Sequence, residues 1–153
     1  MMTVCRRYSC DHKEAEDMLQ ESFIRIFASV HQYRFEGSLE GWIRRIVIHT
    51  AIRMIQRKKV HFAELPEDLP DTHVVEADAL TNLSAEELLG LISKLPDGYR
   101  TVFNLYVIEG YDHKEIATML EITPATSRSQ LLKARLLLQT RINELKKIPQ
   151  NYG

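Results

Sequence analysis

The chain has 153 residues, of which 44% are hydrophobic and 27% are charged, a composition typical of a globular protein with one domain or two small ones. It contains neither a signal-peptide pattern nor an apolar run of the roughly 20 residues needed to span a bilayer. These features predict a cytoplasmic protein without membrane insertion. The two cysteines, Cys5 and Cys10, fit a reduced pair better than a metal site, because no second ligand cluster accompanies them.

The net charge of −1 is unevenly distributed along the chain. Residues 1–60 carry a net charge of +4 and residues 91–153 carry +3, whereas residues 61–90 carry −8 and contain no Lys or Arg. Two basic blocks joined by an acidic segment favour a nucleic-acid partner more than the overall charge does. Prolines and acidic residues without a sustained period predict a linker over 61–83.

The first block predicts two helices with a turn between them. Asp11 and Glu14 have the spacing of a capping box at the start of a helix over about 12–31. After a turn at 33–37, Ser38 is a candidate N-cap for a helix over about 39–59. The apolar stripe of the first helix contains Ala15, Met18, Leu19, Phe23, Ile26, Phe27 and Val30, and the second helix should bury some of Trp42, Ile43, Ile46, Ile52 and Ile55.

The second block predicts four helices. Ser84 and Glu87 have capping-box spacing at the start of a helix over about 85–94, and the next helix spans about 99–109 and ends at Gly110. Asp112 and Glu115 cap a helix over about 112–120, and a final helix runs from Thr123-Pro124 to about Lys147. The fold class is therefore all-α, with two small helical domains at 1–60 and 84–148.

Residues 111–135 have the pattern of a helix-turn-helix, with Ile116, Ala117 and Leu120 packing the first of its two helices. The second helix of this motif offers side chains that suit base edges and phosphates of a DNA major groove. The structural alternative is an ordinary helical hairpin with a solvated polar face. The candidate groove residues are Thr126, Arg128, Ser129, Gln130, Lys133 and Arg135.

Two further surfaces are candidates in the first block. Arg45, His49, Arg53 and Arg57 recur every four residues and form a basic stripe, which is flanked by Tyr33, Phe35 and Trp42. Basic side chains beside aromatic rings suit a single nucleic-acid strand, although a solvated helix face beside core aromatics explains the pattern equally well. Asp17, Gln20 and Glu21 form an acidic surface on the first helix that could dock on a basic protein. No catalytic constellation, metal-ligand spacing or cofactor motif is evident, so we expect neither an enzyme nor a cofactor.

Three segments in order resemble the extracytoplasmic-function (ECF) group of bacterial sigma factors. AEDMLQESFIRIF at 15–27 and GSLEGWIRRIVIHTAIRMIQRKK at 37–59 resemble region 2 of that family, and residues 91–135 resemble region 4. The resemblance implies binding to core RNA polymerase, recognition of promoter DNA and transcription initiation. It also implies an anti-sigma factor as a further partner in many members.

The resemblance also implies roles for individual residues. Asp17, Gln20 and Glu21 would face the clamp of the β′ subunit, and the groove residues of 126–135 would read the −35 element. The −10 element would be held by Arg34, Phe35 and Ser38 of the turn and by Arg45, His49 and Arg53 of the basic stripe.

The sequence departs from the family pattern in three places. The segment before residue 15 is shorter than usual, so the natural protein could begin earlier. His49 replaces a common asparagine, and Glu121 replaces the usual glycine of the helix-turn-helix, where a positive φ would strain it. Two other functions stay open: a helix-turn-helix regulator that binds duplex DNA without polymerase, and a small helical protein that only sequesters partners.

Overall fold

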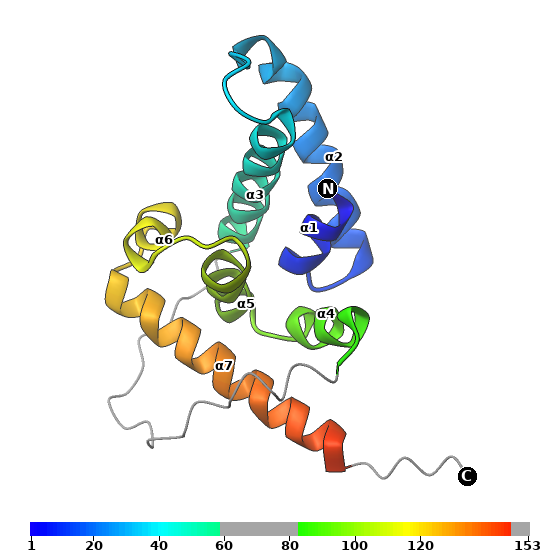
Figure 1. The fold of residues 1–153 in the computed structure, drawn as a ribbon, viewed down its shortest axis with the longest axis vertical. Coiled ribbons are helices and arrows are strands. Elements are labelled where there is room, and N and C mark those ends of the chain that lie inside the picture. The colour runs from blue at the N-terminus through cyan, green and yellow to red at the C-terminus, as the bar shows by residue number, and fades with distance from the viewer. Residues whose placement is uncertain (59–82, 148–153) are drawn as a thin grey trace, which may run out of the picture. The chain divides into compact units, whose positions relative to one another are not determined.

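The computed structural model describes residues 1–58 and 83–147, which form only helices and loops (Figure 1). The chain divides into two compact units, Met1–His61 and Phe62–Gly153. The all-α prediction is therefore confirmed for the described residues. The predicted linker at 61–83 lies almost entirely outside them.

The first unit is built from α1 (Met2–Tyr8), α2 (His12–Ser29) with a short 3₁₀ turn η1 (Val30–Gln32), and α3 (Leu39–Arg57). The helices α1, α2 and α3 all pack against one another. Their shared core contains small and branched side chains that let the helices approach closely. Its members include Val4, Cys5, Tyr8, Ala15, Met18, Ile26, Val47, Ile48, Ala51, Ile52 and Ile55.

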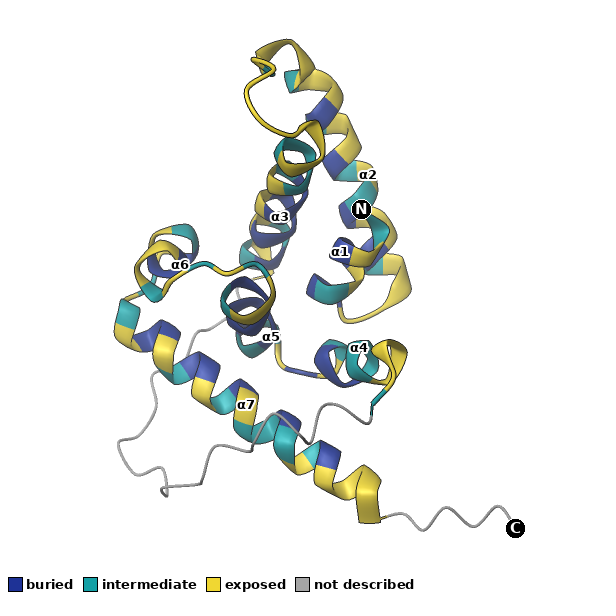
Figure 2. Cartoon of the chain, in the orientation of Figure 1, coloured by how far each residue is buried: buried dark blue, intermediate teal, exposed yellow. Residues whose placement is uncertain are grey.

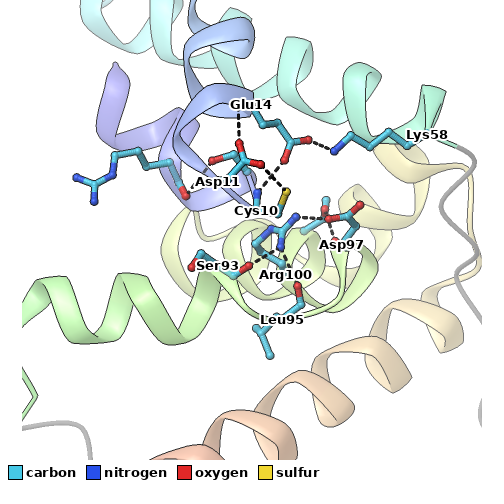
Figure 3. A network of polar contacts seen from close by, with 11 residues as sticks. Cys10, Asp11, Glu14, Lys58, Ser93, Leu95, Asp97 and Arg100 are labelled. Carbon is cyan, nitrogen blue, oxygen red and sulfur yellow. Dashed lines mark hydrogen bonds and ion pairs between the residues drawn. The ribbon is translucent and has the colours of Figure 1, made fainter.

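The predicted capping box at the start of α2 is half formed. The Asp11 carboxylate accepts a hydrogen bond from the Glu14 backbone N–H, as expected. The Glu14 carboxylate does not return to Asp11, because it accepts from the Cys10 N–H at 2.7 Å and pairs with Lys58 at the end of α3 (Figure 3). Glu14 thus links the first turn of α2 to the end of α3. Burial raises the Glu14 pKa, but the hydrogen bonds from Cys10 and the contact with Lys58 outweigh burial, so the pKa is lowered.

The predicted apolar stripe of α2 is only partly buried (Figure 2). Ala15, Met18 and Ile26 belong to the core, but Phe23 and Phe27 are 42% and 73% exposed and stack on each other. Val30 is also exposed. An apolar stripe thus indicates one face of a helix but not how far a neighbour covers it.

The second unit contains α4 (Ala85–Ser93), α5 (Asp97–Phe103), a π-helical turn η3 (Asn104–Ile108), α6 (His113–Leu120) and the long α7 (Pro124–Lys147). α7 packs against α4, α5 and α6. The predicted helix over 99–109 instead begins at Asp97 and changes to π-helical winding after Phe103. Such winding is rare and occurs mostly as single turns within α-helices. This turn ends before Gly110, which has φ +80°.

Arg100 holds the junction of α4 and α5 together from inside (Figure 3). Its side chain is 1% exposed and donates to the carbonyls of Ser93 and Leu95 at 2.9 and 2.7 Å. It also pairs with the Asp97 carboxylate. The last residue of α4 thus gains a donor for a carbonyl that a helix end leaves unpaired, and the loop that follows gains a second.

None of the helices in the described ranges is long and apolar enough to cross a membrane. Cys5 and Cys10 are both free thiols, the first buried and the second exposed.

Candidate nucleic-acid interface

The basic stripe of the first unit occupies the exposed side of α3. Ser38 begins this helix by accepting a hydrogen bond from the Gly41 N–H, so the predicted N-cap is confirmed. Arg45, His49 and Arg53 are exposed and line one wall of a surface pocket of about 580 Å³ between α2 and α3. The spacing of four residues places these cations on one face, because residues i and i+4 are neighbours on a helix.

The pKa of His49 is lowered, first by its partial burial and then by the neighbouring Arg53 and Arg45 guanidinium groups. All three effects disfavour the protonated form of the His49 imidazole. His49 is therefore a neutral hydrogen-bonding side chain near neutral pH, as an asparagine would be.

An aromatic cluster covers the turn before α3. The Tyr33 ring lies 5.0 Å from the Phe35 ring and 5.4 Å from the Trp42 ring, centroid to centroid. Tyr33 also donates through its hydroxyl to the Gly37 carbonyl at 2.9 Å. Phe35 is 87% exposed and has φ +58°, a conformation that bulky residues rarely adopt. The turn thus presents a strained, solvent-facing ring beside the basic stripe.

The acidic surface of α2 is less uniform than the sequence indicates. Asp17 and Gln20 are exposed. Glu21 is half-buried and its carboxylate accepts from the Nε and Nη2 atoms of Arg25 at 2.9 and 2.8 Å. Glu21 therefore belongs both to the acidic surface and to the edge of the pocket, because Arg25 lines that pocket.

The second unit contains the expected helix-turn-helix in α6 and α7. Asp112 and Glu115 form a complete capping box at the start of α6, as do Ser84 and Glu87 at the start of α4. Glu121 ends α6 in the left-handed conformation, with φ 58° and ψ 43°. The strain predicted for a non-glycine residue at this turn is therefore present.

The start of α7 follows the predicted pattern. Thr123 accepts from the Thr126 N–H at 3.1 Å and Pro124 is the first helical residue. The Thr126 hydroxyl lies 2.9 Å from the Thr123 hydroxyl, and Thr126 is buried. Thr126 thus serves the turn and offers little surface to DNA.

The remaining groove candidates on α7 do not share one exposed face. Arg128 and Arg135 are exposed, and Ser129 and Lys133 are half-buried. Gln130 was expected on the groove face, but its side chain is buried and only 1% exposed. Spacing along α7 could not reveal this, because it does not show where the neighbouring helices α4, α5 and α6 pack against that helix.

Aromatic rings hold two of the cations of α7. The Lys133 Nζ lies 5.8 Å from the centre of the Tyr99 ring, and the Arg135 guanidinium lies 5.9 Å from that of Tyr106. Both distances are within the range of cation–π attraction. The sequence analysis missed this support, and it also missed Leu132, which is 40% exposed between Arg128 and Arg135.

His113 joins the two helices of the motif. Its Nδ1 lies 2.9 Å from the Ser127 hydroxyl, and its ring stacks on Tyr106 at 4.5 Å. Burial lowers the pKa of His113, and nearby Arg128 and Arg135 lower it further, against the opposing effect of Asp112. The sequence indicated the helix pair but not this contact, because a histidine at the first position of a helix is not a distinctive signal.

Comparison with protein families gives both units a match. Residues 1–60 match sigma-70 region 2, and residues 85–138 match sigma-70, region 4. Together the two matches cover most of the chain, in the order that the resemblance implied. This pair of regions defines a sigma-70 family protein, a class of non-enzymatic subunit that directs promoter recognition by RNA polymerase.

Curated relatives narrow the class. The chain is 33% identical to the ECF RNA polymerase sigma factor SigE of Mycolicibacterium smegmatis over 87% of its own length and 53% of that protein. It is 29% identical to the ECF RNA polymerase sigma factor SigM of Bacillus subtilis over 87% of its length and 82% of that protein. The chain thus spans about half of SigE and most of SigM. It belongs to the ECF group of the sigma-70 family.

A solved structure has the same fold. The sigma factor RpoE of Bartonella quintana, determined in complex with the anti-sigma factor NepR, aligns with a TM-score of 0.55 over 95% of this chain and 91% of that one. The two sequences are 18% identical.

Proposed function

We propose that this chain binds core RNA polymerase in the cytoplasm and directs it to promoters with −10 and −35 elements. The observation that carries the proposal is the occurrence of both DNA-binding surfaces in one chain. The first unit has cations beside exposed aromatic rings, and the second has a helix-turn-helix. A regulator that binds only duplex DNA has no need of the first surface.

The first unit is proposed to hold the opened −10 strand. Phe35 offers a ring on which an unpaired base can stack, and such stacking is worth about 1–3 kcal/mol per base. Arg34 and Ser38 flank this ring in the turn, and the cations of the basic stripe follow the strand backbone. Asp17, Gln20 and Glu21 contact the β′ clamp in this proposal.

The second unit is proposed to read the −35 duplex with a narrower set of residues than the sequence indicated. Arg128 and Arg135 are the exposed cations, and Ser129 and Lys133 border them. An arginine can bond to both acceptors of a guanine in the major groove. Leu132 can contact a thymine methyl group, whereas Gln130 supports the core.

An anti-sigma factor completes the proposed set of partners. The support is the Bartonella quintana RpoE, which was solved with such a factor. A protein that is encoded by an adjacent gene, co-purifies with this chain and suppresses the transcription that the chain directs would meet this expectation.

The test is transcription in vitro by core polymerase with and without the full chain, on a promoter library. The chain should add specific initiation sites that core enzyme alone does not use. Arg128→Ala should lower initiation at sites with a −35 element about tenfold or more, given about 1–3 kcal/mol for a good base contact. Lys146→Ala, which removes an exposed charge near the far end of α7, is the matched control. Unchanged initiation patterns with wild-type chain would refute the proposal.

Phe35→Ala separates strand opening from duplex binding. It should reduce permanganate reactivity of −10 thymines in the polymerase complex while leaving binding to a −35 duplex intact. Equal opening by the variant and the wild type would remove Phe35 from the proposed mechanism.

A further inference from the structure

The pocket between α2 and α3 has cations on both walls. Arg45, His49 and Arg53 come from α3, and Arg25 and Ser29 come from α2. Its volume of about 580 Å³ is in the range of small-ligand sites and exceeds what one phosphate group needs. The basic stripe of α3 therefore forms only one wall of the pocket. The other wall comes from α2, for which the sequence predicted no DNA contact.

The lining suits an anion with several oxygen atoms. It offers three guanidinium groups, an imidazole and the Gln32 amide, whereas the Ser29 hydroxyl already donates to the Arg25 carbonyl at 2.6 Å. None of the lining residues in the described part of the chain is acidic. A phosphate group accepts hydrogen bonds on several sides at once, and guanidinium groups bind it with paired donors.

Arg25 is the lining residue with a competing partner. Two of its donors contact the Glu21 carboxylate, at 2.8 and 2.9 Å. A guanidinium group has five N–H donors, so Arg25 can also contact a second anion. The carboxylate nevertheless weakens the pocket for that anion, because it places a negative charge beside one of the binding groups.

We propose that this pocket binds a backbone phosphate of a nucleic-acid strand, with Arg25 of α2 as one of its ligands and Glu21 as a carboxylate that competes for Arg25. The inference deepens the proposed function, since it assumes that the first unit binds the promoter strand. Glu21 also belongs to the proposed polymerase surface. A polymerase group that binds Glu21 would release Arg25 to the phosphate and strengthen strand binding in the complex.

The test uses the full chain without polymerase and a fluorescein-labelled single-stranded oligonucleotide, titrated by anisotropy at several low salt concentrations. Arg25→Gln should weaken binding roughly threefold to tenfold and lower the slope of log affinity against log salt by about 0.7, the value for one lost phosphate contact on a single strand. Lys13→Gln is the matched control, because it removes one exposed positive charge from the same helix without touching the pocket.

Glu21→Gln should strengthen oligonucleotide binding severalfold, and Glu16→Gln should do so much less. Glu16 lies on the same helix but pairs with His12. The proposal is overturned if Arg25→Gln and Lys13→Gln have equal effects, if the two glutamate variants are equal, or if the wild type does not bind the strand. Far-UV circular dichroism checks that each variant is folded.

The transcription assay distinguishes the two proposals. If the wild-type chain directs initiation but the Arg25 and Glu21 variants match their controls in oligonucleotide binding, the pocket assignment fails and the proposed function stands. If oligonucleotide binding behaves as expected but the chain never redirects polymerase, the proposed function fails and the pocket remains a strand-binding site.

Discussion

Replacing Glu121 with glycine should stabilise the second unit. Glu121 ends α6 with φ 58°, and the N–H of Glu121 and that of Ile122 both reach the Ala117 carbonyl, the latter at 3.0 Å. The left-handed conformation costs a non-glycine residue about 1–2 kcal/mol. Glycine removes that cost but gains about 0.5–1 kcal/mol of freedom in the unfolded chain, which offsets part of the benefit. The Glu121 charge also opposes the helix dipole, by about 0.3 kcal/mol at an exposed site.

These terms predict that Glu121→Gly raises the free energy of unfolding of the second unit by about 1 kcal/mol. Glu121→Gln is the matched control, because it removes the charge but keeps the Cβ atom. It should gain only about 0.3 kcal/mol. The difference between the two variants isolates the contribution of the backbone.

Urea unfolding followed by far-UV circular dichroism measures this effect. The single tryptophan, Trp42, lies in the first unit, so a dichroism transition without a change in Trp42 fluorescence reports on the second. With a slope near 1 kcal/mol per molar urea, typical of a small domain, the midpoint should rise by about 1 M for the glycine variant. A glycine variant no more stable than the glutamine variant would refute the argument from strain.

Three further changes test other parts of the structure. Arg100→Met should destabilise the second unit by about 3 kcal/mol, because it leaves the Asp97 carboxylate and two carbonyls without their donor; a loss below 1 kcal/mol in the same urea assay would contradict this role. Asp112→Ala should cost about 1 kcal/mol through the lost cap of α6, and an unchanged midpoint would show that the cap contributes nothing. The first unit should lose stability as the pH falls through 6.5, the ordinary pKa of histidine. The pKa of His49 is lower than this in the folded chain, so the unfolded chain binds the proton first. His49→Asn should reduce this loss in Trp42 fluorescence melts. The cations facing His49 are Arg45 and Arg53 on α3 and Arg25 on α2, and an identical pH profile would exclude titration of His49 beside them as the cause.

The helix boundaries were largely predictable because their signals are local. The capping box of Asp112 and Glu115 places its donors and acceptors within four residues, so spacing alone specifies the hydrogen bonds. The same is true of Thr123 before Pro124 and of the left-handed Glu121. The departure at Glu14 also has a local explanation, because a carboxylate one turn into α2 can reach the Cys10 N–H as well as that of Asp11.

The binding faces were less predictable because they depend on contacts between helices. Gln130 has the right spacing for the groove face, yet packing against other helices buries it. Phe23 and Phe27 have the right spacing for the core, yet they are exposed. In both cases helical periodicity gives the direction of a side chain, and only the tertiary structure says what lies in that direction.

Strain at Phe35 and at Glu121 has different consequences for function. Both residues have φ 58°, which local rules disfavour for an ordinary side chain. At Glu121 the exposed carboxylate ends a helix whose dipole it opposes, so glycine improves the local energetics. At Phe35 the same backbone presents a ring that contacts Tyr33 on one side and is 87% exposed, so glycine would relieve strain but remove the stacking surface. Positions where a sequence breaks local rules are often functional sites, and these two show why the side chain must be considered as well as the backbone. Phe35 therefore has a proposed role in strand binding, and Glu121 has none.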